Sequence, residues 1–382
     1  MLAVVAHVIL AGSLLAEDAS SVTKIAPNLW QRTTTGTFEQ IVHPRISVNA
    51  PGHVILQGGN GSHIAYKLTQ RVRARSEAEA RRLLGSSRQS IQPETMLLTF
   101  QYNPDPDSEL VIQVPRQVAM ANLQATRGDI EAYDLDGNVT ARTNGGMIRC
   151  DRIKGGVIGH TGGGEIRLGK IGGSAQCSNG AGSILIDSVA GQASCRTVGG
   201  EITIREGIGP LVLSTEGGNI SVDRAGSNVE AHSGEGVIEI GQANGFVLAD
   251  TRGGSIQIGS ARGVKCDSAQ GTVRVKTASG PLRINTAVGS ILAELLPGTR
   301  VQDALLAAGT GDVTVLIPSN LALSVMARNE AGGQARIVTE FPAVQIFGVN
   351  RPPLRAEGSI NGGGPLLRIN VADGTIFLRR LK

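Results

Sequence analysis

The chain has 382 residues, of which 52 are glycine and only 3% are aromatic. Glycine at this level without a Gly-x-y period excludes collagen, and the abundance of Ile, Val and Leu is not typical of a disordered chain. The formal net charge is only +4, which is small for a nucleic-acid-binding protein, so we expect no nucleic-acid partner.

The chain begins with an apolar run, MLAVVAHVILAGSLLA, followed by small and acidic residues. Such a run is too short to span a bilayer comfortably and is typical of an export signal. We therefore predict a signal peptide over residues 1–19 and no transmembrane domain in the mature chain. The mature chain is expected in the periplasm, at the cell surface or outside the cell.

Residues 20–117 contain several short runs in which apolar and polar side chains alternate, including RISVNA, HVILQGG and ELVIQVP. This alternation predicts strands with one buried face. Ser76 and Glu79 form a capping box for one short helix that ends at Leu84. We interpret this region as a β-rich N-terminal cap, because a stack of strands needs a cover for its first edge.

From residue 118 to residue 300 the chain repeats phrases such as GGEITIREG. Aligned on the first Ile or Val of each phrase, the anchors Ile184, Ile202 and Ile220 follow at steps of 18 residues. Positions two after and seven before each anchor are apolar or small, whereas the positions between them are polar or mixed. A repeat of 18 residues cannot bury its own apolar face and must stack on the neighbouring repeats. The pattern therefore predicts an all-β fold, a parallel β-solenoid of 18-residue coils.

A glycine stands two positions before each anchor. A turn repeated in every coil favours glycine if it needs a positive φ or a close approach of another backbone. The predicted structural turn glycines are Gly128, Gly146, Gly164, Gly182, Gly200, Gly218, Gly236, Gly254, Gly271, Gly289 and Gly311.

Residues 301–382 follow the period only loosely. One degenerate coil fits around Gly333 and Ile337, and the terminal segment returns to the template at Gly374, Ile376 and Leu378. We expect degenerate coils and C-terminal closing strands in this region.

Four cysteines are present, without a Cys-x-x-Cys pair or a His placed to share zinc, so no metal site is expected. Cys177 and Cys195 are 18 residues apart in the same inward column, which places them on neighbouring coils at a spacing that a disulfide tolerates. A disulfide is therefore one interpretation. The other, which we favour, is that both are small buried side chains.

Two further patterns resemble a catalytic carboxylate pair and a phosphate-binding loop, but both are incomplete. Asp250 and Asp267 share an outward column on adjacent coils, and paired carboxylates are typical of glycosidases. A solvated charged face explains them as well. The segment GGEIRLGK has the glycines and lysine of a phosphate loop, but Ile171 stands where the magnesium-binding Ser or Thr is needed. We predict no enzymatic activity and no cofactor, with a carbohydrate-active β-helix enzyme, a polysaccharide lyase or hydrolase, as the alternative.

Thr and Ser recur five positions before the anchors, for example at Thr197, Thr215 and Ser233. A threonine ladder can indicate an ice-binding face. Because this column has the parity of the inward columns, we instead predict that its hydroxyls bind backbone groups at the corner of each coil.

The FEQ opening, the RISVNAPGHVILQGG pair, the RVRARSEAEARRLL segment, the glycine-led coils and the final GGGPLLRINVADGTIFLRR together resemble the bacterial putative adhesin family. These are exported β-strand-repeat proteins of unknown function, and the likeness covers nearly all of the mature chain. The resemblance implies an exported β-solenoid without catalytic residues. We therefore expect a non-enzymatic structural or adhesin-like binding module of the bacterial cell envelope, with an unidentified envelope or extracellular protein or glycan as its partner.

Overall fold

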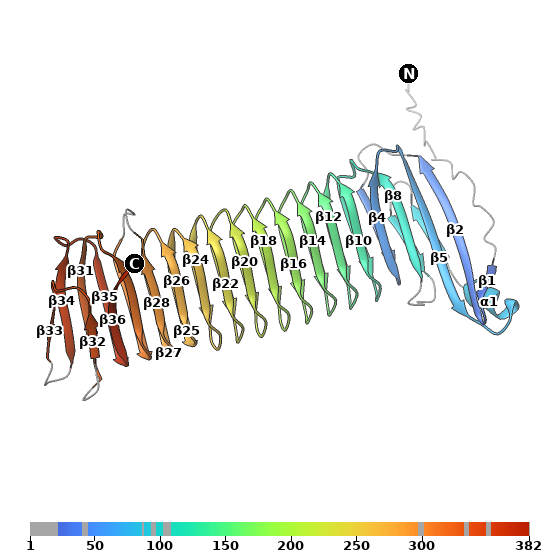
Figure 1. Cartoon of the computed structure of the whole chain (residues 1–382). Helices are drawn as coiled ribbons and strands as arrows, with labels where there is room; N and C mark the ends of the chain where they lie inside the picture. Colours follow the sequence, from blue (N-terminus) through green and yellow to red (C-terminus); the bar gives the residue numbers. More distant parts are fainter. Residues whose placement is uncertain are drawn as a thin grey trace, which may run out of the picture. The chain divides into compact units, whose positions relative to one another are not determined.

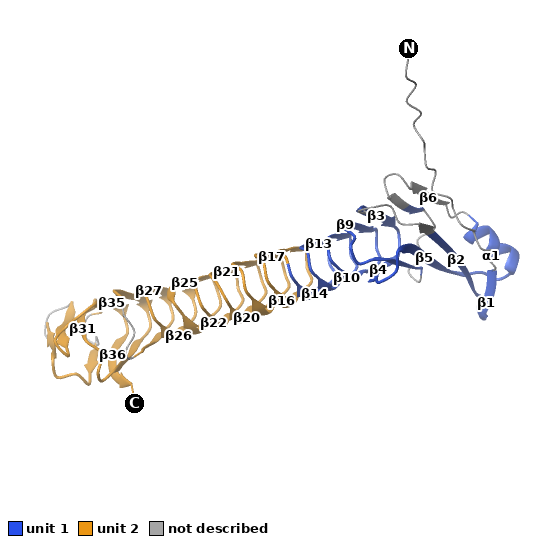
Figure 2. Ribbon diagram, turned by 90° about the horizontal axis from the view of Figure 1, so that it is seen from above, with its two compact units in different colours: residues 1–172 blue, residues 173–382 orange. Residues whose placement is uncertain are grey.

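The chain is an all-β parallel β-solenoid of about 11 coils, spaced about 18 residues apart, as the sequence predicts. It divides into two compact units, residues 1–172 and residues 173–382 (Figure 2). The computed structural model describes residues 22–39, 45–85, 88–92, 97–101, 108–296, 302–331, 336–348 and 353–381. The predicted signal peptide, residues 1–19, lies outside these ranges.

In unit 1 each regular coil gives one strand to each of two parallel sheets. The anchors Ile130, Ile148 and Ile166 are register partners in the first sheet, and all three are fully buried. The first sheet contains β4 (His53–Gly59), β10 (Ile130–Leu135), β12 (Ile148–Ile153) and β14 (Ile166–Ile171). The second contains β3 (Arg45–Ala50), β9 (Met120–Ala125), β11 (Asn138–Thr143) and β13 (Val157–Thr161).

The N-terminal cap covers one end of this stack with antiparallel strands. The long strands β2 (Leu29–Glu39) and β5 (His63–Arg73) pair with each other, and β5 also pairs with β8 (Glu109–Pro115). The remaining cap strands are β1 (Val22–Ala26), β6 (Arg88–Gln92) and β7 (Leu97–Gln101). The cap is β-rich with one helix among its described residues, as predicted.

The cap helix α1 (Glu77–Leu84) begins where the capping box places it. The Glu79 amide donates to the Ser76 hydroxyl oxygen at 3.3 Å, and the Glu79 carboxylate accepts the Arg75 amide at 2.9 Å. The helix buries Ala80 against Trp30, whose indole N–H donates to the Ala74 carbonyl at 3.1 Å.

The first coil of the chain does not lie at the end of its stack. β4 pairs with β8 on one side and β10 on the other, and β3 likewise pairs with β7 and β9. The coil of β3 and β4 therefore lies between the coil of β7 and β8 and that of β9 and β10.

Unit 2 also has two sheets, here named sheet A and sheet B (Figure 1), which are parallel except where β34 pairs antiparallel with β31 and β33. Sheet A contains β16 (Ile184–Val189), β18 (Ile202–Gly207), β20 (Ile220–Ala225), β22 (Ile238–Ala243), β24 (Ile256–Ala261), β26 (Val273–Ala278), β28 (Ile291–Leu295), β30 (Val313–Pro318), β36 (Thr375–Leu381) and β32 (Arg336–Thr339). Sheet B contains β15 (Ala175–Asn179), β17 (Ala193–Thr197), β19 (Leu211–Thr215), β21 (Val229–Ser233), β23 (Phe246–Thr251), β25 (Gly263–Gln270), β27 (Leu282–Val288), β29 (Ala304–Thr310), β35 (Leu366–Asp373), β31 (Leu323–Asn329), β34 (Leu354–Ile360) and β33 (Val344–Phe347).

The core of unit 2 lies between these sheets and follows the predicted columns. Ile202, Ile204 and Leu213 are fully buried, whereas Thr203 points outward. Because the side chains of a strand alternate between its two faces, this burial confirms which columns point inward.

The last coil of the chain is also out of order. β35 pairs with β29 and β31, and β36 pairs with β30 and β32. Ile376 is the register partner of both Val313 and Ile337, so the closing segment and the degenerate coil occupy the predicted columns. Gly333 lies outside the described residues. The closing coil is therefore inserted between two coils that precede it in the sequence.

Candidate functional site

The predicted turn glycines lie where the backbones of neighbouring coils approach closely. A Cβ added at Gly200 would overlap the carbonyl oxygen of Gly182, and one at Gly218 would overlap that of Gly200. The same overlap with the preceding column glycine occurs at Gly146, Gly164, Gly236, Gly254, Gly271, Gly289 and Gly311, and at Gly128 with Gly52. Among the column glycines whose φ is given as positive, the values are 137° to 148°, at Gly271, Gly289 and Gly311. Close backbone approach is therefore the shared requirement.

The predicted hydroxyl ladder binds this glycine backbone. Thr215 Oγ1 donates to the Gly200 carbonyl at 2.9 Å and accepts the Gly218 amide at 3.1 Å. The equivalent donation to a column glycine of the preceding coil is made by Thr143, Thr161, Thr197, Ser233, Thr251, Ser268 and Thr286. The hydroxyls are thus used inside the turn, as expected, and do not form an outer array.

Cys177 and Cys195 are register partners on β15 and β17, as the 18-residue spacing predicts. Both are buried, and both carry free thiols in this structure, as do Cys150 and Cys266. Hydrogen bonding with Cys177, together with burial, raises the pKa of the Cys195 thiol well above its usual range. Both side chains thus lie in the buried column, and a disulfide between them stays the alternative interpretation.

Asp250 and Asp267 are register partners on β23 and β25. Their side chains are 56% and 42% exposed, and each has a basic neighbour: His232 Nδ1 lies 3.8 Å from Asp250, and Lys265 Nζ lies 4.0 Å from Asp267. A general acid needs a carboxyl shielded from water, which raises its pKa. These two carboxylates instead lie on a solvated face, Asp267 in an ion pair with Lys265 and Asp250 beside His232.

The phosphate-loop-like segment lies largely in strand β14 rather than in a loop. Gly169 and Lys170 belong to this extended strand, and the Lys170 amide donates to the Asp151 carboxylate at 3.0 Å. A phosphate needs free amides and positive charge, so an amide that is already bound to a carboxylate does not serve it.

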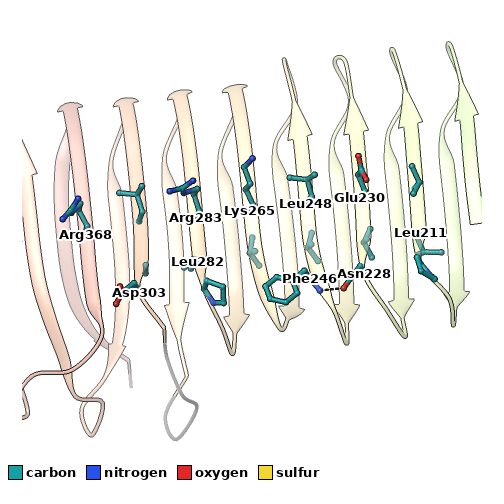
Figure 3. Close-up of a pocket in the computed structure, with 18 of the residues that line it drawn as sticks. Leu211, Asn228, Glu230, Phe246, Leu248, Lys265, Leu282, Arg283, Asp303 and Arg368 are labelled. Carbon is teal, nitrogen blue, oxygen red and sulfur yellow. Dashed lines mark hydrogen bonds between the residues drawn. The ribbon is translucent and has the colours of Figure 1, made fainter. Parts of the chain in front are cut away.

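A groove of about 920 Å³ crosses the outer face of sheet B, over strands β19 to β29 and β35 (Figure 3). Two rows of outward side chains line it, one residue from each coil in register. The upper row is Val212, Glu230, Leu248, Lys265, Arg283, Leu305 and Arg368. The lower row includes Pro210, Asn228, Phe246, Pro281, Asp303 and Leu366.

The upper row carries three cations, here called the cationic row: Lys265, Arg283 and Arg368. Lys265 and Arg283 are direct register partners, and Arg368 follows Arg283 after one intervening coil. All three side chains are exposed. Among the residues that the structure describes, neither arginine has a carboxylate within ion-pair distance. These arginines are therefore free to bind an anion.

The lower row carries an aromatic platform formed by Phe246. Its ring lies across Gly263 of the next coil, where a Cβ would collide with the ring. The Phe246 amide donates to Asn228 Oδ1 at 2.9 Å, and the side chain is 48% exposed. Phe246 therefore presents a flat apolar surface beside the cationic row.

The two carboxylates of the groove already have partners. Glu230 Oε1 lies 2.9 Å from His232 Nε2, and Asp303 Oδ1 accepts the Leu366 amide at 2.8 Å. The groove thus combines two unpaired arginines, a lysine, two hydrogen-bonded carboxylates and an apolar platform.

The sequence pattern carries only part of the signal for this site. Lys265 and Arg283 stand eight positions before their anchors, so a search for charge in the outward columns would find them. Arg368 stands at the equivalent position before Ile376, but its place in the row depends on the inserted coil, which chain order does not reveal.

Within the described residues, no three His, Cys, Asp or Glu side chains are grouped so that they could hold a metal ion. The described part of the chain also contains no helix with the length and apolar character needed to cross a membrane.

No protein-family model matches the chain, and no curated protein matches it. Membership of the putative adhesin family therefore stays a prediction. Among solved structures, the chain matches a putative cell adhesion protein from Clostridium sporogenes with 8% identity and a TM-score of 0.17. The match covers 92% of this chain and 100% of that chain. At so low a TM-score the likeness supports no statement about the function of this chain.

Proposed function

We propose that the mature chain is a non-enzymatic, exported structural and binding module of the bacterial cell envelope. The observation that carries this proposal is the groove on sheet B, which offers unpaired cations and an apolar platform to a ligand. Stacked coils suit such a role because each adds one residue to every outward row, which produces an extended surface rather than an enclosed pocket.

The chemistry of the groove favours binding over catalysis. Among the described residues, its lining contains no Ser, Thr or Cys nucleophile and no His, and its two carboxylates lie four coil steps apart, on β21 and in the segment before β29. Acid and base catalysis needs two groups that converge on one bond. Asp250 and Asp267, the nearest approach to a catalytic pair, are not among the lining residues.

The catalytic side of the proposal is tested by incubating the purified mature chain with acidic polysaccharides and measuring the release of reducing or unsaturated ends. We expect no turnover. Reproducible turnover that disappears in an Asp250→Asn, Asp267→Asn double variant would identify a carbohydrate-active enzyme and refute the proposal.

Export is tested separately by fractionating the producing cells and locating the chain with an antibody. We expect it in the periplasm, on the cell surface or in the medium, cleaved after the apolar run. Recovery of the uncleaved chain from the cytosol would contradict the envelope assignment.

A further inference from the structure

We infer that the groove on sheet B binds an anionic polysaccharide that runs along the stacking direction of the unit 2 coils. This inference rests on the proposed function and names the ligand class for its groove.

The first argument is the spacing of the positive charges. Neighbouring strands in a sheet are about 4.8 Å apart, so Lys265 and Arg283 are separated by one such step and Arg368 lies about 10 Å beyond Arg283. Cations spread over four coils do not converge on one small anion. They match a polymer that carries repeated charges along its length.

The second argument is the platform beside the cations. One face of a sugar ring is lined by C–H groups, and burying such a surface on an exposed ring is favourable. Phe246 offers its ring across Gly263, and Leu248 lies half-buried in the upper row of the same strand. If a sugar ring packs on Phe246, Lys265 lies on the next coil, within reach of an acidic substituent of that sugar.

The third argument separates a polysaccharide from other polyanions. One sugar residue in an extended chain is close in length to one coil step, so successive sugars stay in register with successive coils. A peptide strand advances about 3.3 Å per residue and would fall out of step with the coils. A nucleic acid carries a phosphate on every residue and is bound by larger basic patches than the three cations of this groove.

The binding experiment uses affinity electrophoresis of the purified mature chain through gels containing one polymer at a time. The probes are polygalacturonate, which carries carboxylates, and dextran sulfate, which carries sulfates, with neutral dextran as the uncharged control. We expect at least one of the two anionic polysaccharides to retard the chain and neutral dextran not to do so. Retardation by neither anionic polysaccharide would overturn the inference.

Two matched double variants locate the binding. Arg283→Gln with Arg368→Gln removes two unpaired cations from the groove and should weaken binding about tenfold. Arg274→Gln with Lys276→Gln removes the same charge from exposed positions on β26 of sheet A and should leave binding nearly unchanged. Equal weakening by both pairs would show that net charge alone, and not the groove, is responsible.

The platform is tested by Phe246→Leu, which keeps an apolar side chain but removes the ring. We expect binding about fivefold weaker with an unchanged circular-dichroism spectrum. Undiminished binding would remove Phe246 from the site.

Poly-L-glutamate and a single-stranded oligonucleotide test the other classes of polyanion. If either binds the groove more tightly than both anionic polysaccharides, the ligand class is wrong. The proposed binding module would survive that result, whereas turnover of polygalacturonate would refute the proposed function itself.

Discussion

At the scale of single residues, glycine and threonine act together at each turn. The missing side chain of Gly200 lets its backbone approach Gly182, and the Thr197 hydroxyl binds both the Gly182 carbonyl and the Gly200 amide. Buried backbone groups are costly to leave without a partner. The turn therefore needs a small residue to allow contact and a hydroxyl to satisfy the groups that the contact buries.

Replacing Gly200 with Val should lower the free energy of unfolding by about 1–3 kcal/mol or more, because the new Cβ forces two backbones apart. Thr203→Val is the matched control, since Thr203 lies on the outer face of β18, where a β-branched side chain is tolerated. Urea or thermal unfolding measures both variants. Equal stabilities would show that the glycine column is not a steric requirement.

The thiols give a second residue-scale prediction. Burial raises the pKa of Cys266, and hydrogen bonding with Cys177 and burial raise that of Cys195. Since only an accessible thiolate reacts, a disulfide-exchange reagent at pH 8 should find almost no reactive thiol in the native chain. It should find all four after denaturation without reductant. Recovery of only two would indicate a Cys177–Cys195 disulfide instead.

The raised pKa values of Cys195 and Cys266 also determine how the stability of the fold depends on pH. A thiol whose pKa is raised by folding stabilises the native state while it is protonated. This contribution is fully present below the ordinary thiol pKa and is lost as the pH rises toward the raised value.

At the scale of elements, both units contain a coil that is out of chain order. β3 with β4 in unit 1, and β35 with β36 in unit 2, each lie between two other coils. An inserted coil ties together segments that are far apart in the sequence. In unit 2 the insertion also brings Arg368 into the groove.

Replacing Ile369, a fully buried residue of β35, with Ala should destabilise this region by about 2–5 kcal/mol. Because β35 pairs with both β29 and β31, hydrogen exchange should accelerate in both strands. Asn370→Ala, at an exposed position of the same strand, is the control and should change neither. Unaltered protection of β31 in the Ile369 variant would contradict the placement of β35 between the two strands.

At the scale of the whole molecule, the 18-residue period predicts that complete coils are dispensable. Deleting Leu185–Ile202 joins Ile184 to Thr203, so every inward column is again occupied by its own residue type. We expect a folded chain with an unchanged β circular-dichroism spectrum and a modestly lower melting temperature, because coils contact mainly their neighbours.

Deleting only nine residues, Leu185–Ala193, is the matched comparison. It moves the following turn half a coil out of step and turns apolar positions toward water. Each Ile or Leu so exposed costs about 1.5–3 kcal/mol, against a typical total stability of about 5–15 kcal/mol. We expect aggregation or a broad transition, and a nine-residue deletion that folds as well as the 18-residue one would disprove the stacked-coil architecture.

The sequence alone determined the coil, because the period, the glycine column and the parity of the inward residues all follow from local geometry that recurs in every repeat. The places of Gly200, Thr215 and Ile202 within the coil therefore follow from the repeat itself. The order of the end coils and the groove on sheet B were decided only by tertiary structure. A strand's own residues specify which of its faces is buried but not which strand lies beside it. Arg368 joins Lys265 and Arg283 in the cationic row only because β35, 63 residues beyond β29 in register, packs against that strand.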